Sequence, residues 1–492
     1  MNKEVSPGFF GRLMTWGGLW RDIADKVSGA DDLDNLNPDL PEDDARKIRA
    51  GMDDCLASRG GEVSARARAA TLGRAYLSLN DQGRARFLEM LAREYATDHD
   101  RVRDTAAALM SVDSEDFTAL QAAEGQMRDA LVPPRLRLLK QFNALPRGIK
   151  FLVDMRAELK RLARENPALR GLERDMRDLL ASWFDIGFLE LQRITWNSPA
   201  AFLEKIITYE AVHEIRSWAD LKDRLDHDRR LYAFVHPNMP EEPLIFVEVA
   251  LVHGIAGNVH DLLDMSAPAL DPEDADTAIF YSISNAQEGL AGISFGNFLI
   301  KQVVERLSHS FPKVTTFSTL SPIPGFRTWL DHRLAEGEPG LLLPAERKVL
   351  TQLSETGGDE GDSTGTPSGT KGQFKALIAD PEWPNHEPVA NALKTPLTRL
   401  CARYLVNERR PPRVEGRPAT VLDPVAHFHL TNGARVERLN WLGNRSSKGL
   451  AQSAGLMVNY LYKLNEIEKN HEAYQGQGKV PTSTAIRSLA RT

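Results

Sequence analysis

The feature that most constrains the fold is a change in hydrophobic pattern near residue 190 of a 492-residue chain. Before that point apolar residues recur at steps of three and four, and the clearest stripe consists of Ile149, Leu152, Met155, Leu159 and Leu162. This spacing puts apolar side chains on one face of an α-helix. Segments 81–95 and 169–183 follow the same rule. We therefore predict an all-α helical bundle domain over residues 1–190, with one stripe that also suits packing between subunits.

After residue 190 the pattern becomes one of short runs rich in β-branched and aromatic residues, which predict strands at 231–235, 244–252, 278–284 and 314–318. A helical segment at 298–307 lies between two of them. Such interleaving is typical of an α/β or α+β domain built around a sheet, which we place at residues 191–492. Within it, residues 355–372 are almost free of large apolar side chains and predict a flexible surface insertion.

Composition excludes several classes of protein. No apolar run approaches the roughly 18 residues that a membrane helix needs, and a net charge of −7 opposes general nucleic-acid binding. Only Cys55 and Cys401 are present, far apart, which indicates a reducing compartment and no metal-like cysteine spacing. The first 25 residues lack the pattern of a secretory signal and carry too many acidic residues for a transit peptide. We expect a soluble cytoplasmic protein.

A glycine-rich stretch, QEGLAGISFGN at 287–297, joins an expected strand to an expected helix. Glycines let the backbone approach a ligand, and a helix N-terminus offers free N–H groups, so this stretch suits a phosphate or diphosphate. A plain glycine-rich connection remains the alternative. The stretch also contains the G-x-S-x-G pattern of a hydrolase nucleophile, centred on Ser294. That nucleophile should follow a strand directly, whereas residues 285–291 intervene in this chain.

Ser321 lies in the segment STLSPIPGF, where it ends an expected strand and precedes a proline. A proline pushes the preceding residue into an extended conformation, and a hydroxyl on such a stiff loop is suited to orienting a carboxylate or thioester. A simple Ser-Pro turn is the alternative reading of the same residues.

Two histidines, His427 and His429, fall in a run at 425–430 that alternates like a strand, before the hairpin signal Asn432-Gly433 and a return strand at 434–441. On a strand both would share one face. Histidine suits proton transfer near neutral pH. A metal site would need a third ligand at recognisable spacing, which is missing, and two structural histidines remain possible.

Taken in order, these segments carry a family resemblance. The motifs that carry it are FYSIS, the glycine-rich loop leading into NFLIKQVVERL, FPKVTTFSTLSPIPGF, DPVAHFHLTNGA and GLMVNYLY. Two upstream segments, WFDIGFLELQRITWNSPA and HPNMPEEPLIFVEVALV, add to it. Over residues 183–462 the chain closely resembles the malonyl-CoA decarboxylase family. The SPIPGF and FHLxNGA motifs are its most specific parts.

The resemblance implies an α+β protein, with an N-terminal helical domain that assembles dimers or tetramers and a catalytic domain like the GCN5-related acetyltransferases. It implies Ser321 and His429 as the catalytic pair. Its implied substrate-binding residues are Ser282, Ala291, Gly292, Ile293, Ser294, Phe295, Gly296, Asn297 and Tyr462. Animal members carry a glutamate where this chain has Ser294, so a supporting carboxylate is not carried over to that position.

The expected reaction is decarboxylation of malonyl-CoA to acetyl-CoA and CO2 without metal or organic cofactor. Ser321 would orient the malonyl group, and His429 would protonate the enolate left by CO2. Three other functions stay open: a thioester hydrolase with Ser294 as nucleophile, an acetyltransferase that needs an amine acceptor, and an acyl-CoA-binding regulatory protein without catalysis. The expected partners are malonyl-CoA and other copies of the chain, with neither nucleic acid nor membrane.

Overall fold

The structure is a computed structural model that describes residues 33, 35–57, 61–184, 186–293, 299–356, 369–412, 416 and 418–491. It divides into two compact units. The first, called the helical unit, comprises Met1–Leu189, His236–Pro240 and Gln287–Phe295. The second, the sheet unit, comprises Glu190–Val235, Glu241–Ala286 and Gly296–Thr492. The predicted domain limits, 1–190 and 191–492, stay predictions.

The helical unit is built from amphipathic helices. They are α2 (Glu42–Leu56), α3 (Gly61–Ser78), α4 (Asp81–Arg93), α5 (His99–Ser111), α6 (Phe117–Leu131), α7 (Pro134–Asn143), α8 (Gly148–Leu162) and α9 (Arg170–Trp183), with short 3-10 turns η2 (Pro167–Leu169), η3 (Ile186–Phe188) and η4 (Glu288–Leu290). The helices expected at 81–95, 149–162 and 169–183 are confirmed as α4, α8 and α9.

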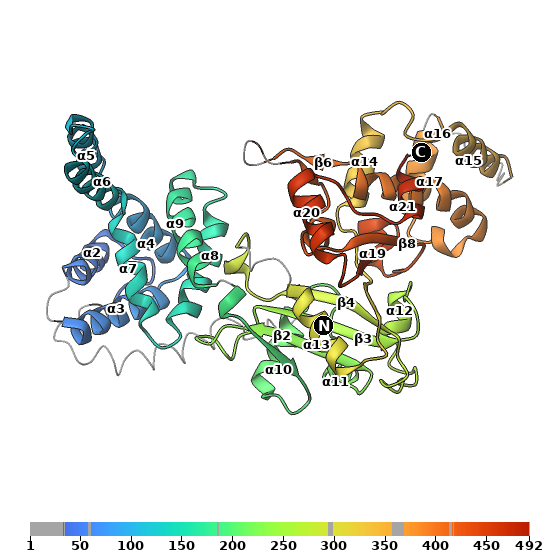
Figure 1. Cartoon of the computed structure of the whole chain (residues 1–492), viewed down its shortest axis with the longest axis horizontal. Helices are drawn as coiled ribbons and strands as arrows, with labels where there is room; N and C mark the ends of the chain where they lie inside the picture. The colour runs from blue at the N-terminus through green and yellow to red at the C-terminus, as the bar shows by residue number, and fades with distance from the viewer. Residues whose placement is uncertain are drawn as a thin grey trace. The chain divides into compact units, whose positions relative to one another are not determined.

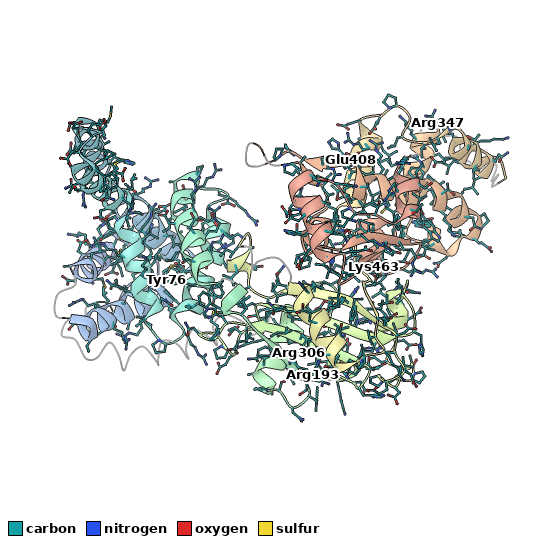
Figure 2. The ribbon with its side chains drawn as sticks, in the orientation of Figure 1. Tyr76, Arg193, Arg306, Arg347, Glu408 and Lys463 are labelled. Carbon is teal, nitrogen blue, oxygen red and sulfur yellow. The ribbon has the colours of Figure 1, made fainter. Side chains whose placement is uncertain are left out.

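The core of the helical unit lies where α3, α4 and α8 meet. The ring of Tyr76, labelled in Figure 2, packs edge-on against Phe87 at 5.1 Å and Phe151 at 5.7 Å. The phenol of Tyr76 donates a hydrogen bond of 2.6 Å to Glu158, which satisfies its buried oxygen. Aromatic pairs of this kind hold the expected apolar faces together.

Helices α5 and α6 form a hairpin that projects from the rest of the helical unit (Figure 1). Each begins at an aspartate whose carboxylate accepts backbone N–H groups, Asp98 for α5 and Asp116 for α6. No residue of α5 is fully buried, and only two small residues of α6 are. The hairpin therefore contributes little to the core of its own unit.

The sheet unit contains a seven-stranded sheet. In spatial order its strands are β1 (Glu190–Ile194), β2 (Arg229–Val235), β3 (Ile245–Val252), β4 (Thr277–Asn285), β5 (Thr316–Thr319), β9 (Met457–Tyr462) and β8 (Arg435–Asn440). All neighbours are antiparallel except β4 and β5, which run parallel. A separate two-stranded ribbon pairs β6 (Arg409–Arg410) with β7 (Thr420–Val421). The predicted strands 231–235, 244–252, 278–284 and 314–318 are confirmed as β2 to β5.

The sheet unit also contains the helices that lie between and after these strands in the sequence (Figure 1). They are α10 (Ala200–Tyr209), α11 (Trp218–Asp223), α12 (Val259–Leu262), α13 (Leu299–Ser310), α14 (Phe326–Ala335), α15 (Pro344–Thr356), α16 (Thr370–Ala379), α17 (Glu387–Val406), α18 (Pro424–Thr431), α19 (Ser447–Ser453), α20 (Ile467–Gln477) and α21 (Thr484–Arg491), with the 3-10 turn η5 (Trp383–Asn385). The predicted fold class, α+β with an all-α N-terminal part followed by a mixed sheet with helices, is confirmed, and the likeness to the acetyltransferases stays a prediction.

One local prediction is wrong. The run 425–430 is not a strand but part of the helix α18, and Asn432-Gly433 ends that helix instead of closing a hairpin. The carboxylate of Asp423 accepts the Ala426 N–H, and Pro424 occupies the first helical position. These are start signals of a helix, and they override the apparent alternation. The return strand expected at 434–441 does exist, as β8.

Two further expectations concern the insertion at 355–372 and helices that could cross a membrane. The predicted insertion 355–372 falls mostly outside the described residues, between the end of α15 and the start of α16. Of the helices that the structure describes, none has the length and apolar character that a bilayer crossing requires.

Candidate active site

Ser321 is held at the end of the parallel pair of strands. Its backbone N–H donates to the carbonyl of Val458 at 2.8 Å, and the Val458 N–H donates back to its carbonyl at 3.0 Å. This single bridge to β9 continues the sheet two residues beyond β5. Because Pro322 follows, the backbone on both sides of the serine is fixed. The hydroxyl is therefore carried by a rigid support.

His429 comes from α18 and makes a hydrogen bond to that serine. Its Nε2 lies 3.1 Å from Ser321 Oγ, and its Nδ1 lies 2.7 Å from the phenol oxygen of Tyr462. The ring stacks on Tyr460, with centroids 4.5 Å apart and planes 23° from parallel. Two hydrogen bonds and a stacking partner leave the imidazole a single orientation.

The direction of these hydrogen bonds follows from the serine. Ser321 Oγ donates to Thr319 Oγ1 at 2.8 Å. A hydroxyl has one proton, so its contact with the imidazole uses Nε2–H as the donor. His429 Nδ1 then accepts the phenol proton of Tyr462. The network thereby assigns the Nε2–H tautomer to this histidine.

Burial controls the charge of this group of side chains. Desolvation lowers the pKa of His429 to about 3, so its imidazole is neutral near pH 7. Desolvation also raises the pKa of Tyr462 well above its usual range, which keeps the phenol protonated. Thr319 is fully buried, and its Oγ1 accepts the Tyr460 N–H at 3.0 Å as well. The result is an uncharged chain of hydrogen bonds from Tyr462 to Thr319.

A buried carboxylate joins the serine loop to the histidine helix. Asp423 is fully buried and accepts the Ala426 N–H at 2.8 Å and the Tyr404 phenol at 3.2 Å. Burial raises the pKa of Asp423, and N–H groups that include that of Gly325 in the serine loop act against this rise. A Cβ on Gly325 would lie 2.2 Å from the Tyr404 oxygen, so the loop packs at this point only as glycine. Asp423 thus binds both segments at once.

The two histidines of the FHL motif point in different directions. Residues two apart on a helix are about 200° apart around its axis, so His427 and His429 do not share a face as the strand prediction required. His427 Nδ1 lies 2.8 Å from the phenol of Tyr474. His429 is the one that reaches Ser321.

Ser282 belongs to a different group of side chains. Its hydroxyl lies 2.8 Å from both carboxylate oxygens of Glu210. The same carboxylate accepts three further groups, the Ser284 hydroxyl and the N–H groups of Val212 and His213. Among the described residues no hydrogen bond joins Ser282 to Ser321, His429 or Tyr462. The structure therefore does not join this predicted site residue to the serine–histidine pair by a direct bond.

The predicted diphosphate loop is described only at its start. Ala291, Gly292 and Ile293 follow η4, and Gly292 has a φ of +82°, a conformation that favours glycine. Ser294, Phe295, Gly296 and Asn297 lie outside the described residues. The hydrolase prediction centred on Ser294 therefore stays a prediction.

Three residues that support the pair directly or through the backbone were missed from the sequence: Thr319, Asp423 and Tyr460. The first lies two residues before Ser321 and therefore on the same side of a strand, which is a readable signal. The second stands directly before a proline, as a helix cap does. Over the described ranges no three His, Cys, Asp or Glu side chains are grouped as metal ligands would be.

Two family profiles and the two animal proteins named below share one description. The profile of the malonyl-CoA decarboxylase C-terminal domain matches residues 187–492, and that of the N-terminal domain matches 95–184. "Malonyl-CoA decarboxylase, mitochondrial" from Anser anser anser is 38% identical over 420 residues, which is 82% of this chain and 79% of that protein. The protein of the same name from Rattus norvegicus is 38% identical over 419 residues, 82% of this chain and 81% of that protein.

Solved structures agree. The crystal structure of malonyl-CoA decarboxylase from Rhodopseudomonas palustris superposes with a TM-score of 0.79 at 40% identity, over 90% of this chain and 99% of that one. The structure of the protein of the same name from Agrobacterium vitis gives a TM-score of 0.76 at 40% identity, with the same coverage.

Proposed function

Because the chain belongs to the malonyl-CoA decarboxylase family, a family of carboxy-lyases, we propose that it converts malonyl-CoA to acetyl-CoA and CO2 with Ser321 and His429 as its catalytic pair. One observation carries the assignment: a buried imidazole whose tautomer is set by Tyr462 presents its N–H to Ser321. A proton donor and a carboxylate-orienting hydroxyl are the two groups that this reaction requires.

The chemistry explains why two such groups suffice. When the bond between the carboxylate and the α-carbon breaks, CO2 leaves and the bonding electron pair stays on the α-carbon. The thioester carbonyl delocalises that pair as an enolate, so the substrate supplies its own electron sink and the proposal includes no cofactor. One proton must then form a new bond to the α-carbon, and it must come from a correctly placed acid.

Each residue of the pair has one role in this proposal. Ser321 donates its hydroxyl proton to the malonyl carboxylate in place of Thr319, which holds the carboxylate out of the thioester plane, where its bond breaks most readily. His429 delivers the Nε2 proton to the α-carbon as the enolate forms. Its Nδ1 takes the phenol proton of Tyr462 in exchange, and a proton from bulk solvent restores the phenol after CO2 has left, so that each turnover consumes one proton.

The remaining site predictions enter as parts of the same proposal. Residues 291–297 bind the diphosphate of CoA, and Ser282 lines the acyl site together with Tyr462. The helical unit assembles dimers or tetramers. The cytoplasm stays the proposed compartment, in keeping with two buried free cysteines, Cys55 and Cys401; the goose and rat proteins carry the word mitochondrial in their names.

The experiment that tests the reaction is incubation of the purified protein with malonyl-CoA while CO2 and free thiol are both measured. Decarboxylation yields CO2 and acetyl-CoA in equal amounts with no thiol. A hydrolase would release the CoA thiol and be labelled at Ser294 by a serine-reactive probe. An acetyltransferase would be inert without an amine, and a regulatory protein would bind without turnover. Each of the last three outcomes would overturn the proposal.

The assignment of the pair has its own test. We expect Ser321→Ala and His429→Asn each to lower kcat by at least about 100-fold, because each removes a group that acts on the reacting atoms. Binding of acetyl-CoA, measured by calorimetry, should change little. The matched control is His427→Asn, which alters the neighbouring histidine that contacts Tyr474. Wild-type turnover in either variant of the pair would refute the two catalytic roles.

A further inference from the structure

The start of the predicted diphosphate loop packs with the helical unit. After β4 ends, the described residues 287–293 belong to the helical unit. The turn η4 lies directly on the backbone of α8, because a Cβ on Gly289 would come within 1.8 Å of the carbonyl oxygen of Val153. Only glycine allows so close an approach. The loop that leads to the ligand therefore begins on a helix of the N-terminal part.

Arg156 of α8 binds this turn through its backbone carbonyls. The guanidinium is almost fully buried and donates to the carbonyl oxygens of Gly289 and Ala291, the second at 3.2 Å. It also forms an ion pair of 2.7 Å with Glu173 on α9, which compensates its charge. One turn further along α8, Lys160 reaches the carbonyl of Glu288. Two basic side chains of the helical unit thus hold carbonyls of the loop.

A side chain that binds a backbone carbonyl also fixes the direction of the N–H group in the same peptide unit. In a trans peptide the C=O and the following N–H point in opposite directions. Because the Ala291 carbonyl points at Arg156, the N–H of Gly292 points away from α8. No described residue accepts a backbone hydrogen bond from that N–H. Gly292 is exposed, has a φ of +82°, and has open space where a Cβ would be. An outward N–H on an open glycine is a typical donor to a phosphate oxygen.

We propose that Arg156 is a positioning residue of the acyl-CoA site: it orients the Gly292 amide towards the diphosphate of the substrate. This inference rests on the proposed function and adds to it a residue that shapes the start of the diphosphate loop. Arg156 acts through the loop backbone and does not itself touch the substrate.

The test compares two substrates, malonyl-CoA and malonyl-pantetheine, which lacks the diphosphate. In Arg156→Met we expect the KM for malonyl-CoA and the Kd for acetyl-CoA to rise about tenfold or more, the size of one lost charge-assisted hydrogen bond. The kcat should stay within about twofold to threefold, because the reacting atoms are untouched. The kcat/KM for malonyl-pantetheine should not change, since no diphosphate is present to lose its donor.

The matched control is Arg135→Met. Arg135 is also a buried arginine of the helical unit, held by Asp175 at 2.7 Å and by the Ala92 carbonyl at 2.8 Å, and neither of these partners belongs to the loop. The substitution should lower the melting temperature as Arg156→Met does without raising KM for malonyl-CoA. Arg156→Lys keeps the buried charge beside Glu173 and should give a KM for malonyl-CoA between those of the wild type and Arg156→Met. This variant therefore still tests the rise in KM if the methionine variant fails to fold.

Two results would overturn the proposal. One is a folded Arg156→Met protein with the wild-type KM and Kd. The other is an equal loss with both substrates, which indicates general damage to the fold. A wild-type protein that releases no CO2 would instead refute the proposed function, and the acetyl-CoA calorimetry would still decide the role of Arg156.

Discussion

Ser321 and His429 are 108 residues apart in the chain, yet every side-chain polar atom of the pair has a defined hydrogen-bond partner. The serine hydroxyl is held by Thr319, and the imidazole is held between Tyr462 and the stacked ring of Tyr460. Fixing two side chains before substrate arrives removes the entropy cost of aligning them during the reaction. At the scale of single residues, the site is therefore organised by the partners of the pair.

The first residue-scale prediction concerns the phenol of Tyr462. Tyr462→Phe removes the donor that fixes the tautomer of His429 and leaves the buried Nδ1 without a partner. A buried acceptor left unpaired costs about 1–3 kcal/mol, so kcat should fall by roughly 10- to 100-fold. KM should stay close to that of the wild type. Steady-state kinetics decide the matter, and an unchanged kcat would show that the phenol does not orient the histidine.

The second concerns acid stability. Burial lowers the pKa of His429 and of His213 to about 3, whereas both ionise near the usual pKa of 6.5 once the chain unfolds. Between these values the unfolded chain binds more protons, so the free energy of unfolding should fall as the pH falls from about 6.5 towards 3. The slope is about 1.4 kcal/mol per pH unit for each histidine.

Urea unfolding at a series of pH values measures that slope, and His429→Asn should reduce it. Above about pH 6.5 both histidines are neutral in either state and contribute no slope. For the same reason kcat should show no inflection near 6.5 from His429. A kinetic pKa near 6.5 that disappears in His429→Asn would contradict the assignment of a neutral imidazole.

Much of the site was predictable at this scale, and what was missed has a physical reason. The family motifs around Ser321 and His429 singled out both residues, and the structure joins them by a hydrogen bond, while their catalytic roles stay a prediction. Their local spacing alone did not, because a serine before proline and a histidine in a short apolar run occur in many structures. Arg156 gave no signal at all. Its importance depends on a contact with Gly289, which lies 133 positions later in the chain.

At the scale of elements, α18 is the informative case. Apolar and polar residues alternate over 425–430 as they do in a strand. Six residues are too few to distinguish this two-residue period from the helical period of about 3.6 residues. Asp423 and Pro424 carried the deciding information, since a cap followed by proline begins a helix. The long periodic helices α4, α8 and α9 and the strands β2 to β5 were predictable because their patterns repeat over more residues or are buried on both faces.

The prediction at this scale concerns Asp423, which caps α18 and accepts the N–H of the serine loop. Asp423→Ala should lower the free energy of unfolding by about 1–2 kcal/mol through the lost cap. It should also lower kcat, because helix and loop no longer share an anchor, and raise KM much less. Asp116→Ala, which removes the cap of α6 in the helical unit, should lower stability and leave kcat unchanged. Equal kcat values for the two variants would argue against a positioning role.

At the scale of the whole molecule, the α5–α6 hairpin is the surface we expect to be covered in the oligomer. Met110 is 87% exposed and Phe117 is 68% exposed, and neither helix buries a large side chain in its own unit. Apolar side chains exposed together on one projection are typical of an interaction site. The proposed assembly through the helical unit gives them a partner, a second copy of the chain.

We therefore expect Met110→Asp combined with Phe117→Asp to reduce the oligomer to a smaller multiple of the 54.8 kDa chain. Light scattering after size exclusion measures that mass. The control is Val349→Asp, which places the same charge at an exposed apolar position of α15 in the sheet unit. A double variant that keeps the wild-type mass, or a wild type that is already monomeric, would exclude the hairpin as the interface.

The contact between Gly289 and Val153 also limits which part of the chain can be exchanged with a related gene by recombination. The helical unit is assembled from three separate stretches of sequence, and one of them is the loop after β4. A recombination event that exchanged only residues before 190 would replace Val153 and Arg156 while Gly289 stayed behind. The new helix would meet a turn shaped for the old one. We therefore expect a chimera that exchanges only residues before 190 to lose this contact, unless the turn at 288–290 is exchanged together with them.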